Sequence, residues 1–348
     1  MRFRSAGATI WASSVLAAAI VIREAPAADA PGSDKFHPTA QDKIVPARAK
    51  VELLWNEGEF TEGPAPAADG AILFSDIGNR ILHYDPRTGE TIDFREPSGK
   101  SNGLKFDRQG NLVACEGAAP GGNRRISITD PNGKTRTLAD RFGGRRFNSP
   151  NDLAITAGGN VYFTDPRYVG DEPRELDFEG VFLITPKKEV RVATRDVQKP
   201  NGIVVTPDDK TVYLADNNNK PEGNHQLLAF AVRADDTLAD KHVLYDFGPG
   251  RRGIDGMTLD VEGRIYATAG GGPEAGIYVF GPQGEHLAFI ATPGDPSNCV
   301  FGIGDQASTL YITGAGPNQP TGDAKRPYAL YRVRLTTAGY HLFPSPAP

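Results

Sequence analysis

Six polar residues recur along the chain at similar spacing, and each carries a side-chain oxygen. Each is a carboxylate or carboxamide beside a small or turn-forming residue, in TEGP, SNGL, SPND, PNGI, IDGM and SNCV. They are Glu62, Asn102, Asn151, Asn201, Asp255 and Asn298, separated by 40, 49, 50, 54 and 43 residues. If the fold brings them together, two carboxylates meet in a confined space, which is costly without a cation. The pattern therefore predicts a divalent-cation site.

Calcium suits this set of oxygen donors best, because it accepts six to eight oxygen ligands with water in the gaps. Mg²⁺ and Mn²⁺ also take oxygen ligands, although Mg²⁺ demands a stricter octahedral geometry. Zn²⁺ is the least favoured alternative, since none of the six positions is a His or Cys.

Short strand-like runs must position these residues. Runs such as AILFSD, NLVACE, VYFTD and VYLAD end 14–16 residues after one of the six positions. They are rich in β-branched and aromatic residues, and DPRTG, DPNGK, TPDDK and GPQGE predict hairpin turns between strands. The acidic residues at the ends of four runs are expected to lie on the innermost strands and to be structural: Asp76, Glu116, Asp165 and Asp216.

A unit of about 40–50 residues with several short strands is typical of a propeller blade. Six such units account for residues 51–343. We therefore predict an all-β chain, a six-bladed β-propeller of four-stranded blades. Equivalent residues at the heads of the inner strands then converge on the central channel. Each polar motif by itself is ordinary turn chemistry, and the shared register of all six favours a site.

The segments TEGPAP, NSPNDLAI, VYFTDPRY, KPNGIVVTPDDKTVYLAD, IDGMTLD and SNCVFGIGD resemble the SMP-30/gluconolactonase/LRE-like family over about residues 51–335. The resemblance implies a six-bladed propeller with a divalent metal, usually calcium, in its channel, and hydrolysis of lactones or related esters. GRRFNSPND is similar to the bacterial gluconolactonase branch, which implies a role in carbohydrate metabolism with a sugar lactone as substrate.

The resemblance also implies roles for individual residues. Glu62, Asn151, Asn201 and Asp255 match the family's metal ligands, and Asp255 also matches its catalytic base or nucleophile. A basic residue near the third-blade motif contacts the sugar in that branch, and Arg146 is the nearest candidate. The second blade departs from the family pattern at ACEGAAPGGNRR, so contacts are not carried over from that loop.

The chemistry that follows is attack of water on a metal-polarised carbonyl, with Asp255 as proton acceptor. Asp255 would then bind the metal through one oxygen and keep the other free. Asn102 and Asn298 could hydrogen-bond sugar hydroxyls or the developing oxyanion, or simply cap loops.

Composition narrows the classes of partner. The 348 residues carry a formal net charge of −5 without a long basic run, which argues against nucleic acid. Cys115 and Cys299 are 184 residues apart and form neither a disulfide framework nor a zinc motif. We expect two buried free thiols.

The N-terminus has the pattern of a Sec-type signal peptide at residues 1–30. Arg2 and Arg4 precede an uncharged stretch at 5–22, and Ala28-Asp29-Ala30 has the form of a cleavage site. We expect a periplasmic or secreted protein without a membrane span after processing. A polar lead-in at 31–50 and a tail at 344–348 would flank the propeller.

Two other functions stay open on the sequence. An esterase or phosphotriesterase could use the same metal site, with its choice of substrate set by the pocket walls. A non-catalytic exported propeller could bind sugars or proteins around a structural calcium. The particular lactone and the oligomeric state are not specified by these patterns.

Overall fold

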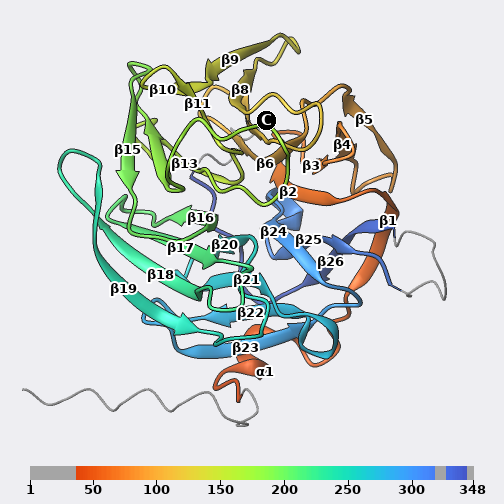
Figure 1. Ribbon diagram of the computed structural model, residues 1–348. Coiled ribbons are helices and arrows are strands. Elements are labelled where there is room, and N and C mark those ends of the chain that lie inside the picture. The colour runs from red at the N-terminus through yellow and green to blue at the C-terminus, as the bar shows by residue number, and fades with distance from the viewer. Residues whose placement is uncertain (1–36, 318–326, 343–348) are drawn as a thin grey trace, which may run out of the picture. The chain divides into compact units, whose positions relative to one another are not determined.

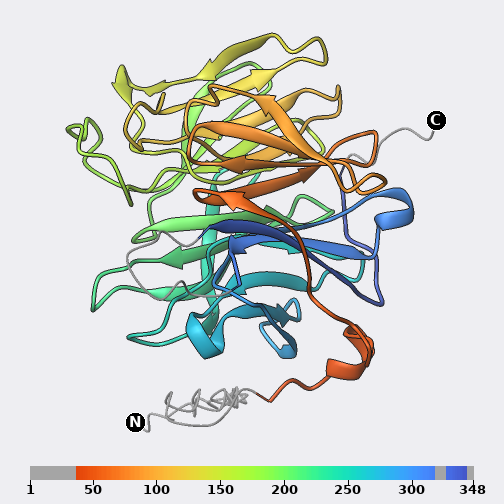
Figure 2. The same cartoon turned by 90° about the vertical axis from the view of Figure 1, so that its right-hand side faces the viewer.

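The computed structural model describes residues 37–317 and 327–342, which are mostly β-strand. Six antiparallel sheets of four strands are arranged around a common axis (Figure 1). In the side view the strands run from one face of the ring to the other (Figure 2). The predicted six-bladed β-propeller is confirmed. The predicted signal peptide at 1–30 and the tail at 344–348 lie outside the described residues.

Each of the first five blades is a meander whose first strand lies innermost. Blade 1 contains β2 (Thr61–Pro66), β3 (Ile72–Asp76), β4 (Arg80–Tyr84) and β5 (Thr91–Arg95), and blade 2 contains β6 (Ser101–Phe106), β7 (Leu112–Glu116), β8 (Arg125–Thr129) and β9 (Thr135–Ala139). Blade 3 contains β12 (Leu153–Ile155), β13 (Val161–Thr164), β14 (Val181–Ile184) and β15 (Val190–Thr194). Blade 4 contains β16 (Pro200–Val205), β17 (Thr211–Asn217), β18 (His225–Val232) and β19 (Leu238–Asp246), and blade 5 contains β20 (Met257–Leu259), β21 (Ile265–Ala269), β22 (Gly276–Phe280) and β23 (His286–Ala291). The four predicted hairpin turns all join consecutive strands.

Blade 6 closes the ring with strands from both ends of the fold. It contains β24 (Pro296–Phe301), β25 (Thr309–Ala315), β26 (Tyr328–Arg334) and β1 (Glu52–Gly58). Antiparallel pairing of β1 with β26 supplies the outermost strand. The lead-in before β1 includes α1 (Gln41–Ile44), which lies beside β23 (Figure 1). There Gln41 exchanges two hydrogen bonds with the backbone of Phe289, at 2.8 and 2.9 Å.

Six apolar clusters, counted over the described residues, fill the interfaces between neighbouring blades. Because side chains alternate between the two faces of a strand, one strand contributes to two interfaces. In β3, Ile72 and Phe74 pack toward blade 6, whereas Leu73 packs toward blade 2. Cys115 and Cys299 are free and buried in different interfaces, which confirms the expected free thiols.

Four acidic residues lie within one residue of the ends of second strands, not of innermost strands: Asp76, Glu116, Asp165 and Asp216. The expected position was wrong. The 14–16 residues that lead from each of the six polar positions to the end of the following run hold an innermost strand, a tight turn and a second strand, so the run is the second strand. Their expected structural role is confirmed by hydrogen bonds. Asp165 accepts the backbone N–H groups of Asn148 and Ser149, each at 2.7 Å, and Asp216 accepts that of Lys199 at 2.7 Å.

A two-stranded hairpin, β10 (Arg141–Phe142) and β11 (Arg145–Arg146), lies between blades 2 and 3. The other short elements are the 3-10 turns η1 (Gly272–Glu274) and η2 (Gly304–Gln306). Among the described residues, no helix is long and apolar enough to cross a membrane.

Candidate metal and active site

The six predicted positions stand at the starts of the six innermost strands. Four lie within β2, β6, β16 and β24, and two lie two residues before β12 and β20: Glu62, Asn102, Asn201 and Asn298, then Asn151 and Asp255. Backbone hydrogen bonds join neighbouring starts, as from Gly103 N–H to the carbonyl of Asn151 at 2.7 Å. The Ser297 hydroxyl donates to the carbonyl of Thr61 at 2.6 Å and links blade 6 to blade 1. We call these six residues the oxygen ring.

Glycines after the oxygen-ring residues allow this close approach. A Cβ on Gly202 would lie 2.5 Å from the carbonyl oxygen of Asp255. A Cβ on Gly256 would lie 2.1 Å from the side chain of Asn298. Contacts this short exclude any side chain, so the recurring NG and DG pairs are needed to pack the strand starts together.

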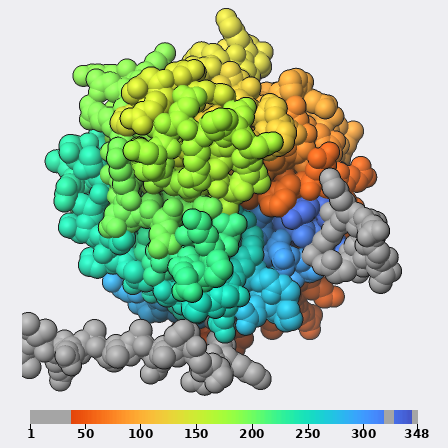
Figure 3. Space-filling model, in the orientation of Figure 1, coloured from red at the N-terminus to blue at the C-terminus, as the bar shows by residue number. Residues whose placement is uncertain are grey.

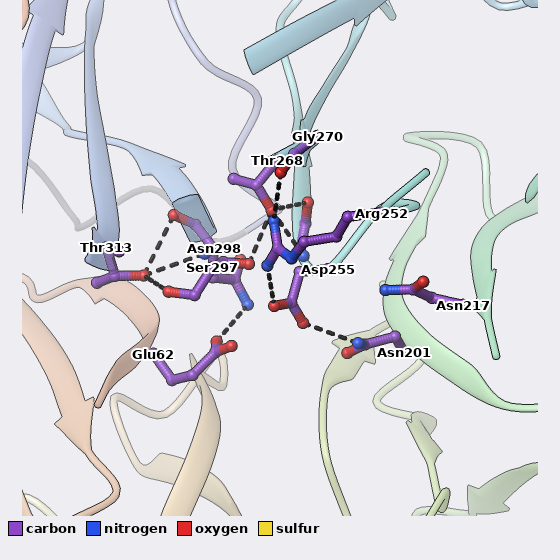
Figure 4. Close-up of polar contacts among 12 residues, drawn as sticks. Glu62, Asn201, Asn217, Arg252, Asp255, Thr268, Gly270, Ser297, Asn298 and Thr313 are labelled. Atoms are coloured by element: carbon purple, nitrogen blue, oxygen red, sulfur yellow. Dashed lines mark hydrogen bonds and ion pairs between the residues drawn. The ribbon is translucent and has the colours of Figure 1, made fainter. Parts of the chain in front are cut away.

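Asp255 has one hydrogen-bond donor on each carboxylate oxygen (Figure 4). The Asn201 amide donates to Oδ1 at 2.7 Å, and the Arg252 guanidinium donates to Oδ2 at 2.6 Å. The Asp255 side chain is 15% exposed. Burial raises the pKa of this carboxyl, while the nearby charge of Arg252 and the hydrogen bonds oppose that shift. The two donors orient the carboxylate from both sides, so neither oxygen is free, in contrast to the free oxygen that we expected from the sequence.

Glu62 is the second carboxylate of the oxygen ring, and its side chain points into the same space as that of Asp255 (Figure 4). Its Oε2 accepts the N–H of Gly63 at 2.9 Å and the amide of Asn298 at 3.2 Å. Burial, together with the negative charge of Asp255, raises the pKa of Glu62 well above its ordinary value. A buried acid whose pKa is raised further by the charge of a second acid favours a positive ion between the two.

The four amides of the oxygen ring differ in what they offer. The oxygen of Asn298 accepts the N–H of Cys299 at 2.8 Å, so this amide presents its nitrogen to Glu62. The nitrogen of Asn201 is used by Asp255, and its oxygen has no partner among the described residues. The Asn151 side chain has no hydrogen bond to any described residue. The oxygen of Asn102 is buried and unpaired within the same residues.

Arg146 lies in β11, outside the oxygen ring, and contacts two acidic residues. Its Nη1 is 3.2 Å from Oε2 of Glu172, and its backbone N–H donates to Glu175 at 2.8 Å. Its Nη2 donates to the carbonyl of Asn123 at 3.1 Å. Arg146 therefore contacts residues of the surrounding loops and none of the described residues around Asp255.

Arg252 is a contact of the oxygen ring that the sequence analysis missed. Besides its ion pair with Asp255, it donates to the carbonyl of Gly270 at 3.2 Å, so two contacts fix its guanidinium. Its signal was a cation three residues before the aspartate in RRGIDG. Asp152 was also missed. It is buried at 4% exposure beside Asn151 and accepts the N–H of Leu153 at 2.9 Å.

Tyr168 was missed as well, because it comes from the long connection at 165–180. Its hydroxyl donates to the carbonyl of Asn217 at 2.7 Å and accepts from Asn201 at 3.3 Å. Figure 3 shows yellow-green side chains of this connection covering part of the face seen there. Nothing in its local sequence signals a contact with a residue 33 positions away.

The donor set suits a hard cation more than a soft one. Glu62, Asn151, Asn201 and Asp255 offer oxygens, and no group of three or more His, Cys, Asp or Glu suited to a metal occurs within 37–317 and 327–342.

Residues 60–316 match the SMP-30/Gluconolactonase/LRE-like region, a stretch that includes the whole oxygen ring. A gluconolactonase of Zymomonas mobilis subsp. mobilis is 31% identical in an alignment 309 residues long, which covers 80% of this chain and 82% of that protein. The chain belongs to the SMP-30/gluconolactonase/LRE-like family. The resemblance inferred from the six motifs is thereby confirmed.

Solved structures agree with this membership. A gluconolactonase from Xanthomonas campestris superposes with a TM-score of 0.71 at 28% identity, covering 85% of this chain and 92% of that one. Regucalcin from Agrobacterium tumefaciens, described as a calcium-binding protein, has a TM-score of 0.66 at 18% identity, covering 84% and 95%. At that identity regucalcin shares the fold, and its calcium is a property of that protein.

Proposed function

We propose that this family member hydrolyses a sugar lactone with the help of a divalent cation, calcium before Mg²⁺, Mn²⁺ or Zn²⁺. The observation that carries the proposal is a pair of carboxylates, the buried Glu62 and the largely buried Asp255, pointing into one space (Figure 4). The relatives named gluconolactonase support lactones as the substrate class.

Glu62, Asn151, Asn201 and Asp255 would hold the cation. The free oxygen of Asn201 and the unpaired amide of Asn151 support this assignment, because each leaves a neutral oxygen available beside the two carboxylates. Once bound, the cation would supply Lewis-acid polarisation of the lactone carbonyl.

Asp255 acts as the general base in this proposal. It accepts a proton from the attacking water at Oδ2, the oxygen that Arg252 holds in place. The hydroxyl oxygen bonds to the acyl carbon, the bond from that carbon to the ring oxygen breaks, and the proton passes to the released ring oxygen. The product is a hydroxy acid, in which the oxygen of the water is part of the new carboxyl group and its proton is on the released hydroxyl.

Asn102, Asn298 and Arg146 are the proposed substrate contacts. The unpaired buried oxygen of Asn102 supports a role for this residue, since an unmade hydrogen bond costs about 1–3 kcal/mol and a sugar hydroxyl could supply it. Asn298 presents its N–H groups toward Glu62 and can donate to a substrate oxygen. Arg146 would contact the sugar from β11 once its hydrogen bond to Glu172 is broken.

A pH-stat screen over sugar lactones, combined with metal analysis of the purified protein, tests this function. We expect acid release from at least one sugar lactone and about one divalent cation per chain. Acid release from simple esters or phosphotriesters in place of lactones would assign the site to those substrates. A metal-loaded protein that hydrolyses none of them would support a non-catalytic binding module with structural calcium.

We also propose that the protein is exported to the periplasm or secreted. The basic start, the uncharged stretch and the Ala-Asp-Ala sequence of residues 1–30 support this. N-terminal sequencing of the mature protein should begin at Pro31, and an intact Met1 would contradict export by cleavage.

A further inference from the structure

A cavity lies at the opposite end of the inner strands from the oxygen ring. It has a volume of about 110 Å³. The oxygen ring stands at the strand starts, whereas this cavity is lined by residues at strand ends, such as Pro66 of β2 and Leu259 of β20. Tyr340, His341 and Leu342 form part of its wall, so the last described segment partly covers this end.

The walls of the cavity are mostly apolar. Five of the innermost strands contribute small or branched uncharged residues: Ala65, Ala154, Val204, Thr258 and Val300. The strand of blade 2 contributes Lys105 instead. A lysine here is not needed to fill space, because alanine, valine or threonine fills the corresponding wall on the other blades.

Lys105 is half-buried and has no hydrogen-bond or ion-pair partner in the part of the chain that the structure describes. His341 is the other titratable side chain on the wall. Its ring nitrogen lies 3.0 Å from the carbonyl of Gly302, and burial lowers its pKa to about 4, so it is neutral near pH 7. The ammonium of Lys105 is therefore the one formal charge among the lining residues at that pH.

Asp152 lies close enough for the charge of Lys105 to oppose the rise that burial causes in the pKa of its carboxyl, but the two form no ion pair in the described part of the chain. Asp152 lies beside Gly103, two residues before Lys105 on the same strand, which is about 7 Å along β6. Its two oxygens accept the N–H groups of Leu153 and Ile203, at 2.9 and 3.4 Å. Asp152 lowers the cost of placing a cation nearby and leaves all three N–H groups of Lys105 available.

We propose that this cavity binds a small monocarboxylate with a short branched aliphatic body. The carboxylate would pair with Lys105, and the body would contact Ala154, Val204 and Val300. A cavity of about 150 Å³ holds benzene, so this smaller cavity suits a body of about three or four carbons. Sugar acids are disfavoured, because Thr258, Tyr340 and His341 offer too few hydrogen-bond partners for their many hydroxyls. This site is independent of lactone hydrolysis at the other end.

Calorimetric titration of the full mature protein with isovalerate tests the proposal, with gluconate as the polar comparison. Wild type should bind one isovalerate per chain and show no gluconate binding at this site. Lys105→Met keeps the stem of the side chain and removes its charge, so isovalerate affinity should fall at least about tenfold, the size of a charge-assisted hydrogen bond. Lys134→Met is the matched control, an exposed lysine in the same blade, and should bind like wild type.

Two further variants decide the outcome if Lys105→Met folds poorly. Lys105→Arg keeps the charge and should retain binding, whereas Ala154→Leu fills the cavity and should abolish it. Unchanged affinity in both Lys105→Met and Ala154→Leu would overturn the proposal. The proposal would also be overturned if Arg252→Met lost isovalerate binding and Lys105→Met did not, because the anion would then lie at the oxygen ring.

Discussion

Two sets of buried carboxylates lie close together in this propeller, and they differ in their partners. Asp76, Glu116, Asp165 and Asp216 end the second strands of blades 1–4 and are at most 1% exposed. Asp76 accepts the N–H groups of Glu59 and Phe60, both at 2.9 Å, and Glu116 pairs with Arg95 and Arg125. Each is satisfied by fixed groups of its own or the adjoining blade.

Glu62 and Asp255 are satisfied differently. Their donors are chiefly side chains from other inner strands or loops, Asn298 for Glu62 and Asn201 and Arg252 for Asp255. Such donors can be exchanged for a cation or a substrate without breaking the backbone of a blade. Buried acids paired separately within their own or the adjoining blade stabilise the fold, whereas two acids whose side chains point into one space are available for chemistry.

The largest effect is expected from Asp255→Asn, which keeps the shape and removes the proton acceptor. The kcat for lactone hydrolysis should fall at least about 100-fold, the lower size of a general-base contribution. Steady-state kinetics at saturating calcium measure it. Glu62→Gln is the control, because it should weaken cation binding more than Asp255→Asn does. Hydrolysis at the wild-type rate in Asp255→Asn would move the base elsewhere.

Removal of the cation should lower thermal stability, because a ligand bound by the folded state stabilises it by mass action. At a calcium concentration about 100 times the Kd, the melting temperature should rise by about 5 °C over chelated protein. Scanning calorimetry with and without chelator measures this shift. Glu62→Gln should show little of it. An equal shift in both proteins would place the stabilising calcium outside the oxygen ring.

Asp216→Asn should affect stability and leave chemistry largely intact. The new amide cannot accept the N–H groups of Gln198 and Lys199 as the carboxylate does, so unfolding should become easier by about 1–3 kcal/mol. Urea unfolding measures the loss, and kcat per folded molecule should stay within about threefold of wild type. A large loss of kcat with unchanged stability would erase the distinction between the two sets of acids.

The smallest effect is expected from Asn102→Ala. If Asn102 binds the substrate equally in the ground and transition states, KM should rise about five- to tenfold while kcat is unchanged. Asn132→Ala, an exposed asparagine in the same blade, serves as the control. An effect on kcat alone would instead place Asn102 in contact with the developing charge.

The repeated parts of this molecule could be predicted from the sequence, because the same short motifs recur from blade to blade. The NG and DG pairs, the hairpin turns and the strands buried on both faces are all recognised from residues that are neighbours in the sequence. Long-range features could not be predicted in this way. The pairing of β1 with β26 joins segments about 280 residues apart, and no local pattern specifies it.

The same division holds at the site. The oxygen ring was predictable since one motif marks each member. Arg252 and Tyr168 reach it from loops that differ between blades, and Tyr168 lies 33 residues from the asparagine it contacts. Lys105 could not be distinguished from a surface lysine, because only the folded ring shows that the neighbouring blades present apolar walls beside it.

The most direct test of the account is the rate of lactone hydrolysis by metal-stripped protein as calcium is added back. For wild type and Asp216→Asn the rate should rise from near zero and saturate with one cation per chain. For Glu62→Gln the rise should require much higher calcium. A stripped wild-type protein that hydrolyses lactone at full rate, or a Glu62→Gln curve that overlays the wild-type curve, would contradict a cation-dependent site in the oxygen ring.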